Sequence, residues 1–235
     1  MFFIYTHLCI DFGDIWFILM IEGLSVWEID YHIHNMGLKD LKMNFLVDIA
    51  TDLFMCRSIQ DVTIKDIAIS AQVGEATVYR YFGTKQKLVV LAAMKIQEIV
   101  NSDYFKPSKD LNGYQNLEVF YQSYLRIFKK HAGFYKFLNE FDIYMSGDRS
   151  GILDAYEEAI DQYKNIFMTA YEQGLKDGTV IEQKDIDLFY FTTTHSMIEL
   201  CKKLSLKAVL NQDLIIKKEN EIKCLIEIIL HSLKK

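Results

Sequence analysis

Apolar side chains recur at intervals of three and four positions along most of the chain, the spacing that places them on one face of an α-helix. The first clear series has its apolar positions at Phe45, Leu46, Ile49, Ala50, Leu53 and Phe54. This series predicts a helix that starts at Leu41 and ends near Cys56.

Two short helices are predicted next. The first follows Thr63, whose hydroxyl can accept a hydrogen bond from a free N–H group of the first turn while Asp66 accepts one in return, as in a capping box. Val73 is expected to fill the angle between the helices, and Gly74 to cap the second helix, EATVYRYF. Two short helices joined by a turn around a buried valine are the helix-turn-helix pattern.

A longer helix is expected after Thr84, and it runs to Asn101. Its apolar positions, Leu88, Leu91, Ala92, Ile96 and Ile99, repeat at helical spacing. Lys87 occupies the third helical position, so no capping box closes this helix start. The stretch SDYFKPSKDLNG follows, and because it contains the only proline of the chain it predicts a boundary.

Beyond this boundary the pattern predicts helices at residues 114–131, 133–145, 151–175, 185–206 and 213–233. The glycines that fall between or just after these segments, as at helix ends, are Gly133, Gly147, Gly151, Gly174 and Gly178. No segment alternates as a strand does. We therefore expect an all-α fold, with an N-terminal helix-turn-helix domain at residues 41–102 and a C-terminal helical domain at residues 110–235.

Residues 1–40 are expected to be an N-terminal extension. They are apolar enough to suggest a membrane segment, but they lack a basic start, and three acidic residues between positions 11 and 22 interrupt every run of spanning length. A membrane span is therefore rejected. An upstream start codon explains the extension best, with Met36 or Met43 as the ordinary start, and the alternative is an extra helix or strand packed on the body.

Composition and charge narrow the class of protein. One proline in 235 residues, of which 51% are apolar, favours a helix-rich protein with a large core. The formal net charge of −6 argues against a non-specific coat on nucleic acid, so any anion binding must be local. Between Arg57 and Lys95, six basic and three acidic residues leave a local charge of +3.

Several kinds of site are not indicated by the sequence. None of the four cysteines stands in a C-x-x-C pair, which fits the reduced thiols of a cytoplasmic protein. No glycine-rich phosphate loop, nucleophile with its base or metal-ligand spacing is present, so we expect no enzyme activity, no cofactor and no metal. The pair His32 and His34 is interpreted as ordinary surface histidines.

The stretch ATVYRYFGTKQKL, residues 76–88, combines three aromatic with three basic residues. On a helix-turn-helix this local positive charge favours duplex DNA. Tyr79 and Tyr81 are interpreted as donors to phosphates, and Arg80 as a reader of a base edge, because arginine pairs with guanine O6 and N7. Lys85 is placed beside a phosphate, at the start of the next helix.

Residues 43–90 resemble the DNA-binding domain of the TetR (tetracycline-repressor) family of bacterial transcriptional regulators. The most specific part is TVYRYFGTK, which fits the pattern T-V-Y-x-Y-F-x-[ST]-K. The resemblance implies double-stranded operator DNA as a partner. The expected contact residues are Thr63, Lys65, Gly74, Glu75, Ala76, Thr77, Tyr79, Arg80, Tyr81 and Lys85.

Four positions depart from the family pattern. Ser58 and Gln72 stand where glycine is usual, and Gln72 is strained by about 1 kcal/mol if its backbone is left-handed. Gly74 replaces a serine or threonine cap, and Ala76 takes a common glycine position. Because residues 74–77 are altered, the resemblance does not give the preferred base sequence.

The predicted C-terminal helices are rich in aromatic residues. At helical spacing such residues are more often core than pocket, but the resemblance implies a small-molecule pocket in this domain. The candidates are Tyr121, Tyr124, Phe128, Phe141, Tyr163, Phe167 and His195. The expected ligand is small, mostly apolar, and flat or elongated.

The resemblance also implies a homodimer joined through the last two helices, which presents two recognition helices to a palindromic operator. The candidate interface residues are Ile222, Ile226, Ile229 and Leu233. The predicted function is a transcriptional regulator, a repressor that a small apolar molecule releases from its operator. The alternative is a helix-turn-helix protein without small-molecule sensing, which acts through a protein or membrane partner.

Overall fold

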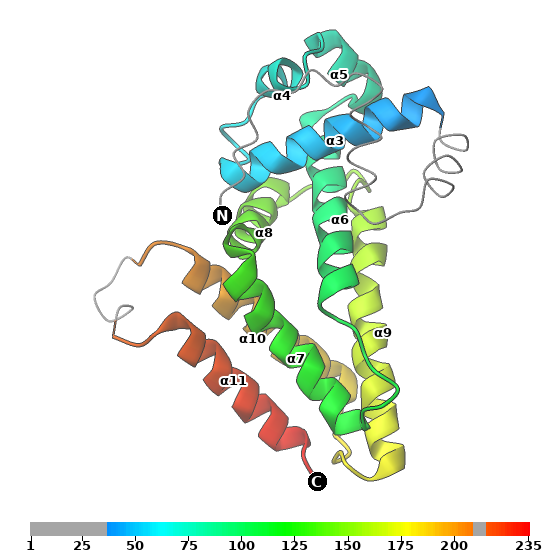
Figure 1. Ribbon diagram of the computed structural model, residues 1–235, viewed down its shortest axis with the longest axis vertical. Helices are drawn as coiled ribbons and strands as arrows, with labels where there is room; N and C mark the ends of the chain where they lie inside the picture. Colours follow the sequence, from blue (N-terminus) through cyan, green and yellow to red (C-terminus); the bar gives the residue numbers. More distant parts are fainter. Residues whose placement is uncertain (1–36, 209–214) are drawn as a thin grey trace. The chain divides into compact units, whose positions relative to one another are not determined.

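The computed structural model describes residues 37–208 and 215–235 (Figure 1). The helices there are α3 (Leu38–Cys56), α4 (Ile64–Ser70), α5 (Glu75–Phe82), α6 (Lys85–Asp103), α7 (Gly113–Lys130), α8 (Ala132–Met145), α9 (Asp154–Asp177), α10 (Ile186–Ser205) and α11 (Lys218–Leu233). Outside these helices, the only β pairing in the described ranges is an isolated antiparallel bridge between Val180 and Lys234. The predicted all-α fold is confirmed.

The chain divides into two compact units, residues 1–46 and 47–235. The predicted border between a domain at 41–102 and one at 110–235 stays a prediction. The expectations for the N-terminal extension, including His32 and His34, lie outside the described residues.

The two short helices begin as their sequence predicts. Thr63 Oγ1 accepts from the Asp66 backbone N–H at 3.1 Å, and the Asp66 carboxylate accepts from the Thr63 N–H at 2.8 Å, so the capping box is confirmed. Gly74 is extended and caps α5 without a side-chain bond. Gln72 has a φ of 54°, the left-handed conformation in which a glycine is less strained.

The turn valine between α4 and α5 is less buried than its predicted role suggests. Val73 is only half-buried, whereas Val78 and Phe82 on α5 are buried. Because these two side chains stand one turn apart on the helix, they give α5 one buried face and leave the opposite face in solvent.

Helix α7 is the centre of the C-terminal packing and contacts α8, α9, α10 and α11 (Figure 1). Its buried face carries several aromatic rings, among them Phe120, Tyr121 and Tyr124. Full burial of a large apolar side chain contributes about 1.5–3 kcal/mol, so this helix anchors the core.

The prediction that Gly174 ends a helix is wrong, because α9 continues through it to Asp177 and ends at Gly178, whose φ is 77°. Gly174 allows a close approach instead. A Cβ on Gly113, the first residue of α7, would lie 2.0 Å from the Gly174 backbone nitrogen. Only glycine fits at this crossing of α7 and α9.

Candidate functional site

The face of α5 opposite Val78 and Phe82 is exposed. It carries Tyr79, which is 51% exposed, and Arg80. The predicted contact residues Thr63, Lys65, Gly74, Glu75 and Ala76 are exposed as well, and Thr77 and Tyr81 are half-exposed. Nine of the ten predicted contacts are thus at least partly exposed on α4 and its N-cap, on α5 or in the turn between them, and we call this part of the protein the α4–α5 surface.

Three cations near this surface stand without an ion pair among the residues that the structure describes. They are Lys65 on α4, Arg80 on α5 and Lys87 on α6. The Arg80 guanidinium lies 5.5 Å from the centroid of the Tyr81 ring. A stacked ring restricts the arginine side chain without neutralising its charge, so the cation stays available to an anion.

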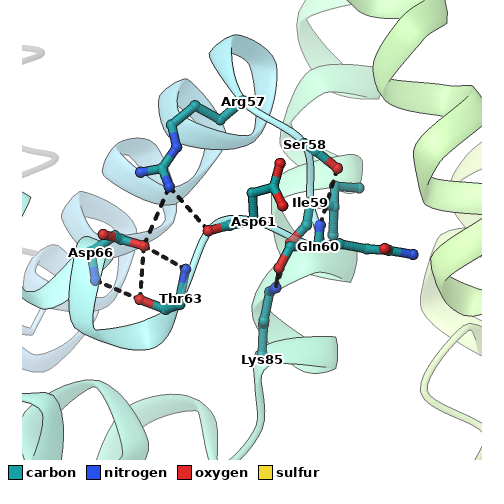
Figure 2. A network of polar contacts seen from close by, with 8 residues as sticks. All are labelled: Arg57, Ser58, Ile59, Gln60, Asp61, Thr63, Asp66 and Lys85. Carbon is teal, nitrogen blue, oxygen red and sulfur yellow. Dashed lines mark hydrogen bonds and ion pairs between the residues drawn. The ribbon is translucent and has the colours of Figure 1, made fainter.

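The loop from α3 to α4 is held by a polar network (Figure 2). Arg57 Nη2 donates to the Asp61 carbonyl at 3.0 Å and lies 3.6 Å from the Asp66 carboxylate. Hydrogen bonds from Thr63, assisted by the charge of Arg57, hold the pKa of Asp66 below its usual value. Arg57 therefore acts inside this network, and its charge adds little to the α4–α5 surface.

Lys85 is the first residue of α6, where it was predicted, and its contact with a phosphate stays a prediction. Its ammonium donates to the carbonyls of Ile59 and Gln60 in the same loop (Figure 2). It also lies 5.2 Å from the centroid of the Tyr144 ring on α8, and burial lowers its pKa. Lys85 ties the start of α6 to the α3–α4 loop, and a phosphate contact would require it to leave these carbonyls.

A second contact joins the same loop to α8. Glu140 Oε2 accepts from the Ile59 backbone N–H at 2.7 Å. Together with Lys85 and Tyr144, this hydrogen bond makes a link between α8 and the α3–α4 loop that we call the α8 clasp. It joins α8 to the residues that precede α4.

Helix α8 also borders a cavity of about 570 Å³ that lies among α6, α7, α8, α9 and α10. Its lining residues on α8 are Phe134, Tyr135, Leu138 and Asp142. One helix therefore contributes both to the cavity wall and to the α8 clasp.

Three of the seven predicted pocket residues line this cavity, namely Tyr124, Tyr163 and His195. Tyr121, Phe128, Phe141 and Phe167 do not. The Tyr121 hydroxyl is hydrogen-bonded to Thr193 at 2.7 Å, Phe167 is fully buried in the core, and the other two pack against rings of neighbouring helices. Helical spacing indicates which face of a helix is inside, but not which part of the interior is filled.

Polar groups from two helices meet across the cavity. Gln97 on α6 accepts from the Tyr163 hydroxyl at 2.5 Å and donates to the Tyr156 hydroxyl at 3.1 Å, so it bridges α6 to α9. Burial raises the pKa of Tyr156 to about 12, although the hydrogen bond from Gln97 opposes this rise. Both phenols are neutral at pH 7.

A charged cluster stands at another part of the wall. Lys202 donates to Asp142 and, at 2.6 Å, to Glu199. Burial alone would lower the pKa of Lys202, but the two carboxylates outweigh it and raise the pKa. No pattern in the sequence indicates this cluster, because a lysine within an apolar helix ordinarily extends its ammonium to water.

The predicted interface residues on α11 are already covered within one chain. Ile222, Ile226 and Leu233 have no exposed surface and Ile229 has 5%, because this face packs against α7 and α10. The expected interface is corrected accordingly. The exposed apolar side chains of the last two helices are instead Leu188, Phe191 and Ile228.

Two further kinds of site were sought in the described ranges. No helix there combines the length and the hydropathy that a bilayer crossing requires. No three His, Cys, Asp or Glu side chains in residues 37–208 and 215–235 are grouped to hold a metal ion.

Comparison with known proteins agrees with this arrangement. The profile of the family described as "Bacterial regulatory proteins, tetR family" matches residues 46–92, from α3 into α6. The HTH-type transcriptional repressor KstR2 of Rhodococcus jostii (strain RHA1) is 27% identical over 154 residues, 62% of this chain and 71% of that protein.

Solved structures share the fold at low sequence identity. A transcriptional regulator from Saccharomonospora viridis, in complex with choline, has a TM-score of 0.64 at 16% identity, covering 82% of this chain and 97% of that one. FadR from Bacillus subtilis, in complex with stearoyl-CoA, has a TM-score of 0.59 at 14% identity, covering 80% and 97%.

Proposed function

Because the chain belongs to the TetR family of bacterial regulatory proteins and is a DNA-binding transcriptional regulator, we propose that it is a repressor that a small, mostly apolar molecule releases from its operator. The observation that carries the proposal is the exposed α4–α5 surface, with Tyr79 and Arg80 standing opposite the buried Val78 and Phe82. The curated relative KstR2 is a repressor, which supports the sign of regulation.

The α4–α5 surface has the chemistry of a DNA reader. Arg80 presents a planar cation that can pair with two acceptors of a guanine, and its stacking on Tyr81 reduces the side-chain freedom lost on binding. Lys65 and the Tyr79 hydroxyl are suited to phosphates, which position a protein without reading sequence. Lys85 contributes indirectly, because its ammonium donates to carbonyls of the α3–α4 loop that precedes α4.

Sensing is assigned to the cavity among α6 to α10. Its volume of about 570 Å³ suits a small molecule, and its wall is mostly apolar and aromatic. Structural relatives hold choline in one case and stearoyl-CoA in another, so this fold accommodates ligands of different chemistry. A ligand that fits the cavity better when α8 is displaced shifts the population towards that state and, through the α8 clasp, moves the α3–α4 loop.

A homodimer is proposed on the exposed faces of α10 and α11. Leu188 is 64% exposed and Ile228 is 62% exposed, one on each helix, although both helices bury their other face within the chain. Two copies joined here present two α4–α5 surfaces, which matches an operator with two half-sites.

The experiment that tests this function is a selection of duplexes from a random library by the purified full chain, followed by sequencing. We expect one shared sequence with two related half-sites. Enrichment without a shared sequence would mean non-specific binding and would refute the operator. An operator that no small molecule releases would favour regulation through a protein or membrane partner.

A further inference from the structure

Two tyrosine hydroxyls at the cavity stand without a partner. Tyr124 on α7 and Tyr190 on α10 both line the cavity, with 6% and 7% of their surfaces exposed. Within the described ranges neither hydroxyl takes part in a hydrogen bond, whereas those of Tyr135, Tyr156 and Tyr163 do. A buried hydroxyl without a partner is uncommon, because its desolvation is not compensated.

The two side chains are neighbours. Both rings contact Phe120, with centroid separations of 5.9 Å for Tyr124 and 6.5 Å for Tyr190. Burial raises the pKa of Tyr124, and the adjacent phenol of Tyr190 adds to the rise. Burial and the charge of Asp161 raise the pKa of Tyr190 to about 12. Both phenols keep their protons at neutral pH and are available as donors.

The charged side chains around the cavity indicate whether a neutral or an anionic ligand is favoured. Its two lysines are already paired, Lys202 with two carboxylates and Lys164 with Asp187 at 2.7 Å. The carboxylate of Asp161 is exposed and unpaired among the described residues. An anionic ligand would therefore bring a desolvated charge to a wall whose two lysines are already neutralised by carboxylates, which is unfavourable.

We propose that the cavity takes a neutral, flat, mostly apolar molecule with one carbonyl oxygen, which accepts hydrogen bonds from both Tyr124 and Tyr190. A carbonyl oxygen has two lone pairs, so it can accept a hydrogen bond from each of these two hydroxyls. This inference rests on the proposed sensing function and specifies its ligand class.

The test uses three probes of one shape with the full-length protein. 2-Acetylnaphthalene carries the carbonyl, 2-isopropylnaphthalene has a methyl group in place of the carbonyl oxygen, and 2-naphthoate has a carboxylate in place of the acetyl group. By calorimetry the acetyl compound should bind about tenfold more tightly than the isopropyl compound, the value of one or two neutral hydrogen bonds. Tyr124→Phe and Tyr190→Phe should each lower the affinity for the acetyl compound about 3- to 10-fold and leave the affinity for the isopropyl compound unchanged.

Tyr135→Phe is the matched control. Tyr135 also lines the cavity, but its hydroxyl already donates to the Tyr124 carbonyl at 3.0 Å. Without ligand, Tyr135→Phe should lower the thermal unfolding midpoint, whereas Tyr124→Phe should leave it unchanged or raise it. An equal fall of the thermal unfolding midpoint in the two variants would mean that the Tyr124 hydroxyl is hydrogen-bonded within the protein, which overturns the proposal.

The remaining outcomes separate this inference from the proposed function. Equal binding of the acetyl and isopropyl compounds, or tightest binding of the naphthoate, would overturn the proposed carbonyl group of the ligand. The proposed sensing of a small molecule would remain. No binding of any probe overturns the ligand class. Operator selection by the same protein tests DNA binding independently of all three results.

Discussion

The helix-turn-helix segment and the C-terminal helices are stabilised over different distances along the chain. In the first, the defining bonds join residues three positions apart, as from Thr63 to Asp66 and from Thr84 to Lys87. In the second, Tyr163 reaches Gln97 across 66 positions and Tyr121 meets Thr193 across 72. A short segment with local bonds can keep its shape while its exposed face varies, whereas long-range packing sets the size of an interior cavity.

The largest effect is expected from a charge placed in the core of the C-terminal helices, where residues far apart in the sequence pack together. Ile226→Glu on α11 buries a carboxylate where no surface is exposed, and should lower the free energy of unfolding by at least about 3 kcal/mol. Ile228→Glu, two positions on and 62% exposed, should change the unfolding free energy of the monomer, measured at a protein concentration too low for dimers, by no more than about 0.5 kcal/mol. Denaturant unfolding measures both.

The Ile228 variant also tests the proposed dimer interface. Ile228→Glu should reduce the dimer in light scattering while the monomer stays folded. Dimers of unchanged strength in this variant would place the interface elsewhere on the chain.

A smaller effect is expected where the two regions meet. Glu140→Ala leaves the buried Ile59 N–H without its acceptor and should cost about 1–3 kcal/mol, whereas Glu140→Gln retains an acceptor oxygen and should cost less. If the α8 clasp couples the cavity to the DNA, Glu140→Ala should also weaken the response of operator binding to ligand. Identical unfolding curves for both variants would show that the hydrogen bond contributes nothing.

The smallest effect lies in the turn of the helix-turn-helix. Gln72 has a φ of 54°, so Gln72→Gly should raise the free energy of unfolding by about 0.5 kcal/mol. Ser70→Gly, two positions earlier in α4, should lower it by about as much, because glycine weakens a helix. A lower free energy of unfolding in both variants would argue against strain at Gln72.

This contrast explains which features the sequence could predict. The capping box at Thr63 and the cap at Thr84 depend on residues within three positions, and both predictions are confirmed. Local signals alone were enough. Even the exposed face of α5 follows from the period of its apolar residues.

The interior of the C-terminal region could not be predicted in the same way. Gly174 resembles a helix end, but it allows α7 and α9 to approach, and this requires knowing which helices cross. The stripe with Ile226 has the pattern of an interface, but α7 and α10 of the same chain cover it. Tyr121 and Tyr124 stand on one buried face, and only tertiary packing decides that Tyr124 lines the cavity.

The most direct test of the central claim, that the α4–α5 surface reads DNA sequence, is the affinity of the selected operator relative to a scrambled duplex at fixed salt. Arg80→Ala should weaken binding to the operator by about 1–3 kcal/mol more than binding to the scrambled duplex. Lys65→Ala should weaken both duplexes alike and reduce the salt slope by about one. If Arg80→Ala weakens both duplexes equally, or neither, this surface does not read the operator and the account is contradicted.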